Sequence, residues 1–271
     1  MNQYLAHLHA DEAELPEATY LVYGLQLLEC HVPKDQFLVI SKASLAGWRK
    51  TSPGKMRMPV PEEFLFDASV LALDEDRLDI AVAITLQLDA YLRPSECLDL
   101  STDQIAAPQG RKYPHWALVI APSEHGQVTK TGKSDDSVLI GDGKHNQWVR
   151  SVLHLWLQGV SDGPIFPGLT LSQYEKWFRD ANKKLLYSND VLKPHVIRHS
   201  GPSNDCYHGR RRLDEIQKRG RWDARASVVR YEKHATLLHQ WKHCAPKRKQ
   251  IVLGRAQLFQ TRVLAKLRNE R

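Results

Sequence analysis

The sequence predicts a mainly α-helical fold with one small antiparallel β-sheet (an α+β fold). Apolar residues recur at helical spacing along most of the 271 residues. Two short strand-like runs, WALVIAP at 116–122 and SVLI at 137–140, flank a polar segment that contains glycine, which favours a β-hairpin. A proline-rich basic segment, RKTSPGKMRMPVP at 49–61, interrupts the helical pattern and indicates a domain boundary.

The composition is that of a globular protein, with 42% hydrophobic and 25% charged residues. A chain of this length buries roughly 70–75% of its unfolded surface and needs no disulfides. The four cysteines form no C-x-x-C pair, so we expect reduced thiols. No apolar run reaches the roughly 18–20 residues of a membrane span, and the acidic N-terminus does not resemble a signal peptide. We therefore expect a protein of the nucleus in a eukaryote, or otherwise of the cytoplasm.

The formal net charge of +7 is unevenly distributed along the chain. Residues 1–100 carry 8 Lys/Arg against 16 Asp/Glu, residues 101–192 carry 10 against 9, and residues 193–271 carry 20 against 6. The last third therefore predicts a surface that binds a polyanion. A solvated basic face without a partner is the alternative.

The predicted first domain, residues 1–58, is a short helical region that ends in the basic linker. Leu21, Leu25 and Leu28 predict a helix that ends near Pro33, and a second helix is expected over about 34–48. The predicted second domain, residues 59–240, opens with two helices, PEEFLFDASVLAL and DRLDIAVAITLQLDAY. Pro61 is suited to the first turn of the former.

Beyond the hairpin the pattern is helical again. Ser172 and Glu175 fit a capping box at the start of SQYEKWFRDANKKLLY. Three short helices are expected over 195–239, and Pro202 is expected to bend or end the first of them. The predicted third region, 241–271, is a basic tail with a final helix over about 249–268. Its apolar stripe consists of Val252, Ala256, Phe259 and Val263.

Several residues become informative because of their order in the chain. Arg93 and Glu96 are three residues apart, and Pro94 can open a helix between them, so the two side chains share a face. Lys130 lies in VTKTGKSDD, near the tip of the expected hairpin. Lys133 is an alternative to it, because hairpin registers slip easily.

Two further patterns follow. In PHVIRHS, the residues His195, Arg198 and His199 fall on one helical face. In QKRGRWDARASVVRYEKH, Trp222 precedes Tyr231 by nine residues.

This order, Arg-x-x-Glu, hairpin Lys, His-x-x-Arg, then Trp and Tyr nine apart, resembles the tyrosine recombinases (the phage-integrase superfamily) over about residues 61–240. Tryptophan where many members carry a second histidine is similar to the Cre-type and some eukaryotic transposon branches. The resemblance implies a catalytic domain that cleaves and rejoins double-stranded DNA without metal, ATP or a cofactor.

The resemblance implies that four side chains bind the scissile phosphate or orient the groups that bind it. Arg93 and Arg198 would clamp its non-bridging oxygens with permanently charged, paired donors. The indole N–H of Trp222 can only donate, so it would bind the phosphate without acting as an acid or base. Glu96 would orient its neighbours. Alternatively, Trp222 only packs against neighbouring side chains and has no role in binding the phosphate.

Three more residues would carry the covalent chemistry. Tyr231 would attack the phosphorus and form a 3′-phosphotyrosyl enzyme. His195 would donate to the phosphate or shuttle the proton of the nucleophile. Lys130 would protonate the departing 5′ oxygen. Without these upstream partners, Tyr231 would be interpreted as an ordinary core tyrosine.

Other polar groups have weaker interpretations. His199 is expected to support the site from behind or to lie in the core. The pair His195 and His199 lacks a complete set of metal ligands, as does the loose cluster of His234, His239, His243 and Cys244, so no metal is expected. The tetrad PKRK at 246–249 resembles a short nuclear localisation signal.

Six basic residues are candidate DNA contacts because they flank the linker, the hairpin or the active-site motifs. They are Arg49, Lys50, Lys133, Arg210, Arg219 and Arg221. The resemblance further implies a homotetramer in a DNA synapse that is a monomer when free. The final helix would then dock on a neighbouring subunit, or alternatively on its own domain.

The chain departs from the family pattern in its first domain. Only about 60 residues precede the catalytic part, whereas family members usually carry a larger helical core-binding domain. We therefore expect a reduced DNA clamp or, alternatively, a fragment or a degenerate copy of such a protein. Two alternative functions stay open, a type IB topoisomerase and an inactive, domesticated DNA-binding module. Trp222 and the final helix favour the recombinase over the topoisomerase, and the full set of candidate residues argues against the inactive module.

Overall fold

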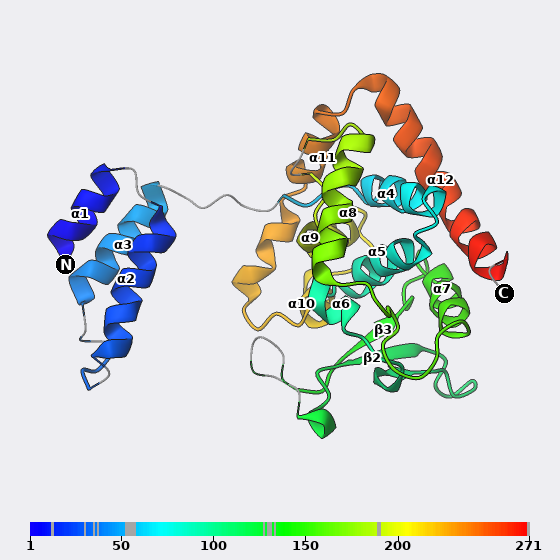
Figure 1. Ribbon diagram of the computed structural model, residues 1–271, viewed down its shortest axis with the longest axis horizontal. Coiled ribbons are helices and arrows are strands. Elements are labelled where there is room, and N and C mark those ends of the chain that lie inside the picture. The colour runs from blue at the N-terminus through cyan, green and yellow to red at the C-terminus, as the bar shows by residue number, and fades with distance from the viewer. Residues whose placement is uncertain are drawn as a thin grey trace. The chain divides into compact units, whose positions relative to one another are not determined.

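The computed structural model describes residues 1–11, 14–29, 31–34, 36, 38–51, 58–126, 128, 132, 134–188 and 191–269. Its elements are mainly helices with one three-stranded antiparallel sheet, which confirms the predicted fold class (Figure 1). The chain forms two compact units, Met1–Met56 and Arg57–Arg271. The boundary lies near the linker predicted from composition. Lys130 and Lys133 lie outside the described residues.

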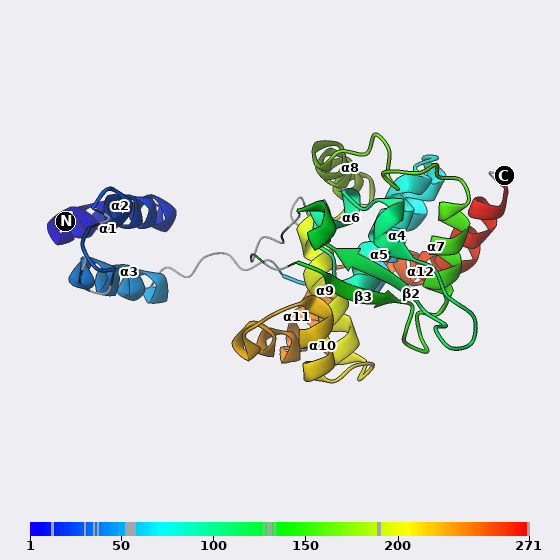
Figure 2. The same cartoon turned by 90° about the horizontal axis from the view of Figure 1, so that it is seen from below.

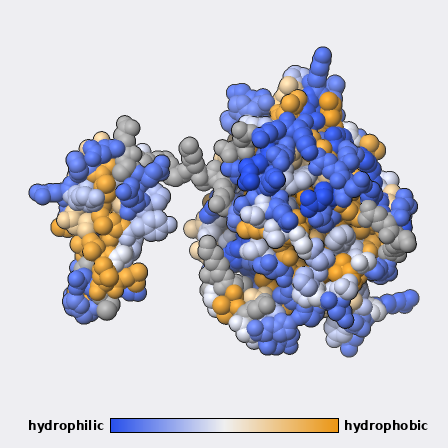
Figure 3. Space-filling view, in the orientation of Figure 1, coloured by the Kyte–Doolittle hydropathy of each residue, from blue (hydrophilic) through white to orange (hydrophobic). Residues whose placement is uncertain are grey.

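The first unit consists of three helices, α1 (Asn2–Ala10), α2 (Leu15–Leu28) and α3 (Val39–Thr51). A proline in its first turn helps to start α2. The small core consists of Leu5, Ala18, Val22, Leu45 and Trp48. Apolar side chains of this unit also stay exposed, among them Leu27, Leu28 and Ile40, and hydrophobic surface is visible on it in Figure 3.

The core of the second unit is built on α4 (Glu62–Asp74) and α5 (Leu78–Ala90). Every residue of α5 except Asp79 is buried. This explains its nearly continuous apolar sequence, since a helix that is apolar all round belongs in a core. The helix α5 packs against α4, α9, α7 and β3, and it ends where Tyr91 adopts a left-handed conformation with φ of 52°.

The sheet consists of β1 (Ile105–Ala106), β2 (Trp116–Ile120) and β3 (Asp136–Ile140) in the order β1-β2-β3 (Figure 2). The predicted hairpin is confirmed: Trp116 faces Ile140, and Ile120 faces Asp136. Alternate residues of β2 and β3 are buried, as expected for strands with one face on the core. The two-residue strand β1 is too short to leave a pattern in the sequence.

Two further helices, α7 (Trp148–Leu157) and α8 (Leu171–Lys184), follow the sheet. The capping box predicted at Ser172 and Glu175 is wrong. Thr170 is the extended residue before α8, and its hydroxyl accepts the N–H of Gln173 at 3.3 Å. The side chain of Gln173 accepts the N–H of Thr170 at 2.8 Å. Both residue pairs fit the capping pattern, and the start of the helix selects the earlier one.

The helices α6 (Pro94–Leu98), α9 (Pro194–Tyr207) and α10 (Leu213–Gly220) lie at the site described below, and α11 (Ala235–Lys242) follows it in the chain. The prediction that Pro202 ends α9 is wrong, since the helix continues through it. A Cβ atom on Gly201 would lie 2.5 Å from the carbonyl oxygen of Leu88, so Gly201 allows α9 to approach α5 closely. This buried packing outweighs the tendency of proline to break the helix.

The last helix, α12 (Pro246–Asn269), belongs to the second unit and packs against α4 (Figure 1). Its buried stripe contains Val252, Phe259, Val263 and Leu267, whereas the predicted Ala256 is half-buried. Ion pairs run along the contact: Arg248 and Arg255 with Asp67, Arg255 and Arg262 with Asp74, and Lys266 with Asp76. Within this single chain the final helix therefore packs on its own domain, and docking on a neighbouring subunit stays a prediction.

Candidate active site

Five of the predicted residues meet where α6, α9 and the end of α10 come together. Arg93 immediately precedes α6, and Glu96 lies within it. Arg198 lies on α9, Trp222 follows α10, and Tyr231 lies in a 3₁₀ turn over Val229–Glu232. Pro94 is the first residue of α6, as the sequence indicates, so Glu96 folds back onto the residue before the helix.

The carboxylate of Glu96 is shared by three guanidinium groups. One oxygen pairs with the Arg93 side chain. The other accepts the backbone N–H of Arg93 at 2.8 Å, Nη2 of Arg221 at 2.5 Å and Nη1 of Arg198 at 3.4 Å. Burial alone would raise the pKa of Glu96, but Arg221, Arg198 and Arg93 outweigh it, and this pKa is lowered. Glu96 is therefore ionised and holds the arginines together.

Arg198 is held on both sides by backbone carbonyls. Its Nη1 donates to the carbonyl of Tyr91 at 2.6 Å, and its Nη2 donates to the carbonyl of Gly220 at 2.9 Å. The side chain is only 6% exposed. Burial lowers the pKa of Arg198 to about 10, so the group remains a cation at neutral pH.

Trp222 contacts both Arg198 and Tyr231. The Arg198 guanidinium is 5.2 Å from the indole ring centre, a cation–π distance, and the rings of Trp222 and Tyr231 are 5.1 Å apart. A Cβ atom on Gly220 would lie 1.8 Å from the indole ring. Only glycine at position 220 therefore leaves room for Trp222 in this position. The structure shows the packing role of Trp222, and its contact with a phosphate stays a prediction.

Tyr231 is 3% exposed and packs with Tyr91, Ile216 and Val228. Its hydroxyl oxygen lies 3.0 Å from Nδ1 of His199. Burial raises the pKa of Tyr231 to about 12, although the nearby charges of Arg230 and Arg198 act in the opposite direction. At neutral pH the phenol therefore keeps its proton.

The contact between His199 and Tyr231 is the main feature of the site that sequence reasoning missed. The sequence placed His199 on one face with His195 and Arg198 and predicted that it supports the site from behind or lies in the core, but it did not predict Tyr231 as its partner. The only available signal was its position one residue after Arg198. His195 lies half-buried on α9, and its predicted role as a proton shuttle stays a prediction.

The structure corrects the interpretation of Arg219 as a phosphate-facing charge. Its side chain is 6% exposed, and its guanidinium bonds the backbone carbonyl of Asp89 at 2.8 Å and the carboxylates of Asp89 and Asp142 at 3.2 and 3.1 Å. Arg210 pairs with Glu62, and Arg221 belongs to the Glu96 cluster. These carboxylates take up donors that sequence reasoning had assigned to DNA.

The candidate DNA contacts in the first unit are exposed, unlike the buried Arg219. Arg49 and Lys50 are exposed in the last turn of α3, and their contact with DNA stays a prediction. Much of the surface of the second unit that faces the viewer in Figure 3 is hydrophilic.

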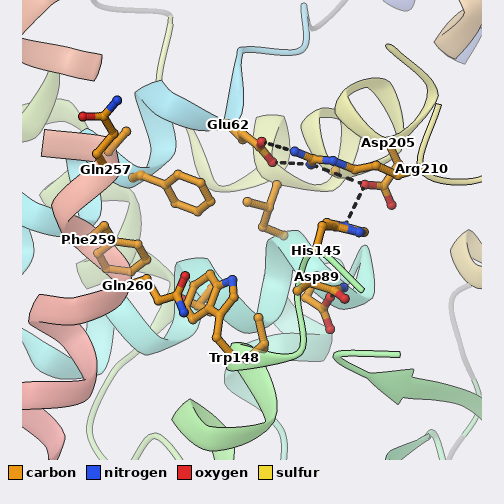
Figure 4. Close-up of a pocket in the computed structure, with 16 residues that line it drawn as sticks. Glu62, Asp89, His145, Trp148, Asp205, Arg210, Gln257, Phe259 and Gln260 are labelled. Atoms are coloured by element: carbon orange, nitrogen blue, oxygen red, sulfur yellow. Dashed lines mark hydrogen bonds and ion pairs between the residues drawn. The ribbon is translucent and has the colours of Figure 1, made fainter. Parts of the chain in front are cut away.

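A cavity of about 270 Å³ lies next to α12, away from the Glu96 cluster (Figure 4). Aromatic side chains line one part of it, and the ion pair Glu62–Arg210 and the contact between Asp205 and His145 line another. Asp205 accepts a hydrogen bond from the hydroxyl of Tyr91. Since the carbonyl of Tyr91 binds Arg198, this wall of the cavity also supports the candidate active site.

Within the described ranges, no three His, Cys, Asp or Glu side chains gather as a metal site. Of the loose cluster noted in the sequence, His239 and His243 lie together, with ring nitrogens 3.3 Å apart. In the same part of the chain, none of the helices combines the length and the apolar character needed to cross a bilayer.

Similar folds occur among solved recombinases. The XerH site-specific recombinase bound to difH substrate, in a pre-cleavage complex, shares 16% identity over 65% of this chain and 50% of its own, with a TM-score of 0.46. XerA recombinase shares 17% over 90% and 89%, with a TM-score of 0.48. The Tn1549 transposon integrase in complex with transposon right end DNA shares 13% over 90% and 86%, with a TM-score of 0.49.

The chain thus spans about half the length of the XerH chain that it matches. No protein-family model and no curated protein matches it. The names of these solved structures describe site-specific recombinases and a transposon integrase.

Replacing Glu96 with glutamine is expected to lower the free energy of unfolding by about 1–3 kcal/mol at neutral pH, because Arg198 and Arg221 lose a buried charged acceptor. The folded-state pKa of Glu96 lies below its ordinary value of 4.5. Its contribution to stability is therefore present above that value and is lost as the pH falls through the folded-state pKa. Urea unfolding over a pH series should show the difference between parent and variant shrinking in acid. A difference independent of pH would contradict the assignment.

Proposed function

We propose that the chain is a DNA-breaking and rejoining enzyme of the tyrosine recombinase type, with Tyr231 as nucleophile. The observation that carries the proposal is a set of three arginines around one ionised carboxylate, Glu96, and a buried tyrosine whose ring contacts the same indole as Arg198. A cationic pocket beside a hydroxyl nucleophile has the chemistry needed to attack a phosphodiester.

The proposed step is a direct displacement at phosphorus. Oη of Tyr231 forms a bond to phosphorus, and the bond from phosphorus to the 5′ oxygen breaks. The phenol loses its proton to a base, and the 5′ oxygen gains one from an acid. Arg93 and Arg198 stabilise the charge that develops on the non-bridging oxygens. The product, a 3′-phosphotyrosyl enzyme, keeps the phosphodiester energy and allows rejoining without ATP.

Lys130 is the proposed acid for the 5′ oxygen. It lies in the segment between β2 and β3, outside the described residues, so the proposal for this residue rests on the order of motifs in the sequence. The complete proposal also includes double-stranded DNA as partner and a homotetramer as the synaptic assembly.

The test is the formation of a covalent adduct. The protein is incubated with nicked duplexes taken from the flanks of its own gene, without added metal, and the mixtures are run on denaturing gels. The parent is expected to give a shifted protein–DNA band, and Tyr231→Phe none. Tyr207→Phe is the matched control, because Tyr207 is 41% exposed on α9 and should not alter the band.

The other outcomes distinguish the alternatives. A band that survives in Tyr231→Phe would reject Tyr231 as nucleophile. DNA binding without any band would favour the inactive DNA-binding module. Rapid relaxation of supercoiled plasmid without a specific site would favour a topoisomerase.

A further inference from the structure

We propose that His199, and not His195, is the base that accepts the proton of Tyr231. This inference rests on the proposed function, since it assigns a catalytic role within the same site. It changes the roles expected from the sequence, which gave the shuttling of this proton to His195.

Direct geometry supports His199. Its Nδ1 lies 3.0 Å from the hydroxyl oxygen of Tyr231, within the range needed for proton transfer. The two rings are 6.2 Å apart and inclined by 32°. His199 lies on α9 directly after Arg198, whose guanidinium is held by two carbonyls and by Glu96. The base and the phosphate-binding arginine are therefore positioned by the same rigid helix.

The surroundings of Tyr231 make a base necessary. Its hydroxyl has a pKa of about 12, because burial outweighs the charges of Arg198 on α9 and Arg230 on its own turn. In the apolar cluster that holds the phenol, the other titratable residues are Tyr91 at the end of α5 and Cys206 on α9, and Trp222 after α10 lies 5.1 Å from its ring. A histidine has an ordinary pKa of about 6.5 and is therefore available in its neutral form near physiological pH.

The proposed proton path is balanced. Neutral His199, with its proton on Nε2, accepts the Tyr231 proton at Nδ1 while Oη bonds to phosphorus. The 5′ oxygen leaves with a proton from Lys130. In the rejoining step the 5′ hydroxyl returns its proton to Lys130 and attacks phosphorus, and protonated His199 returns its proton to the phenolate. No further reactant is required.

Two variants separate positioning from proton transfer. His199→Gln can still hydrogen-bond the phenol but cannot act as a base near neutral pH, and His199→Phe can do neither. We expect both to lower the single-turnover rate of adduct formation by about 10²-fold or more. The parent rate should level off above the pKa of a histidine, whereas the rates of the variants should keep rising with pH as the phenol itself ionises. His208→Gln, an exposed histidine at the end of α9, is the control that should match the parent.

Fluorotyrosine at position 231 makes the test specific. A phenol of lower pKa needs a base less, so the substitution should restore most of the lost rate in His199→Gln. A purely structural role of His199 would leave that loss unchanged. A parent-like pH profile in His199→Gln would overturn the proposal, as would the same change of profile in His195→Gln with none in His199→Gln.

A second readout needs no cleavage. In the free protein labelled with ¹³C at the tyrosine Cζ, we expect the Tyr231 signal to shift as His199 titrates, and His199→Phe to abolish that shift while His195→Gln keeps it. A Tyr231 signal that ignores His199 would overturn the inference. If the parent forms no adduct but this coupling is present, the proposed function fails and the proton contact stands.

Discussion

Replacing Arg198 with alanine should lower the rate of adduct formation by roughly 10²–10³-fold, the usual cost of removing one preorganised donor from a charged transition state. The guanidinium is held by the carbonyls of Tyr91 and Gly220, so it requires little reorganisation to bind a phosphate. Lysine should restore only a small part of the rate, because an ammonium group cannot make the same planar pair of contacts.

The measurement is single-turnover adduct formation with saturating nicked DNA. Arg212→Ala is the matched control, since this arginine has a side chain that is 79% exposed and pairs with Asp214, two residues along the chain. In a second duplex a neutral methylphosphonate replaces the scissile phosphate. This replacement should raise the rate of Arg198→Ala relative to the rate of the parent. Equal rates in Arg198→Ala and Arg212→Ala would show that Arg198 does not contact the reacting phosphate.

Replacing Gly220 with valine should have the second large effect, and it should act on stability and chemistry together. Already a single added Cβ would lie 1.8 Å from the indole of Trp222, so the ring must leave its place beside Arg198 and Tyr231. We expect a loss of about 1–3 kcal/mol in the free energy of unfolding, the usual cost of overpacking. The rate of adduct formation should fall by more than the loss of stability explains, because Arg198 and Tyr231 both lose their contact with the indole of Trp222.

Chemical unfolding and adduct formation together check this result. Gly254→Ala is the control: Gly254 lies inside α12 with open space around its Cβ position, so alanine should be neutral or stabilise by about 0.5–1 kcal/mol. A Gly220→Val protein with parental stability and activity would mean that Trp222 can move aside without consequence.

The sequence allowed the fold class and most of the site to be predicted, because these depend on local patterns. Helical spacing revealed α5, strand alternation revealed the β2–β3 hairpin, and Pro94 placed Arg93 and Glu96 on one face. The order of motifs then brought Arg198, Trp222 and Tyr231 into the same hypothesis. Each of these signals lies within a few neighbouring residues.

The features that were missed depend on contacts between distant residues. The pair of His199 and Tyr231 spans 32 positions, and that of Glu96 and Arg221 spans 125. The helix α9 continues through Pro202 because Gly201 packs closely against α5. Arg219 is buried because its guanidinium pairs with the carboxylates of Asp89 and Asp142. Local sequence propensity does not include such distant partners. The sequence therefore predicted a helix end at Pro202 and a surface charge at Arg219.

The sharing of Glu96 by three arginines has a consequence for the lifetime of the protein. Glu96, together with Asp136 at 3.8 Å from Arg221, does not balance three guanidinium groups, so the folded second unit carries a positive excess where these side chains are largely buried. The unfolded chain disperses these charges and has no comparable receptor. Any phosphodiester that enters the site therefore favours the native state by mass action. Under the proposed function, copies bound to DNA should therefore resist heat and proteolysis better than free copies.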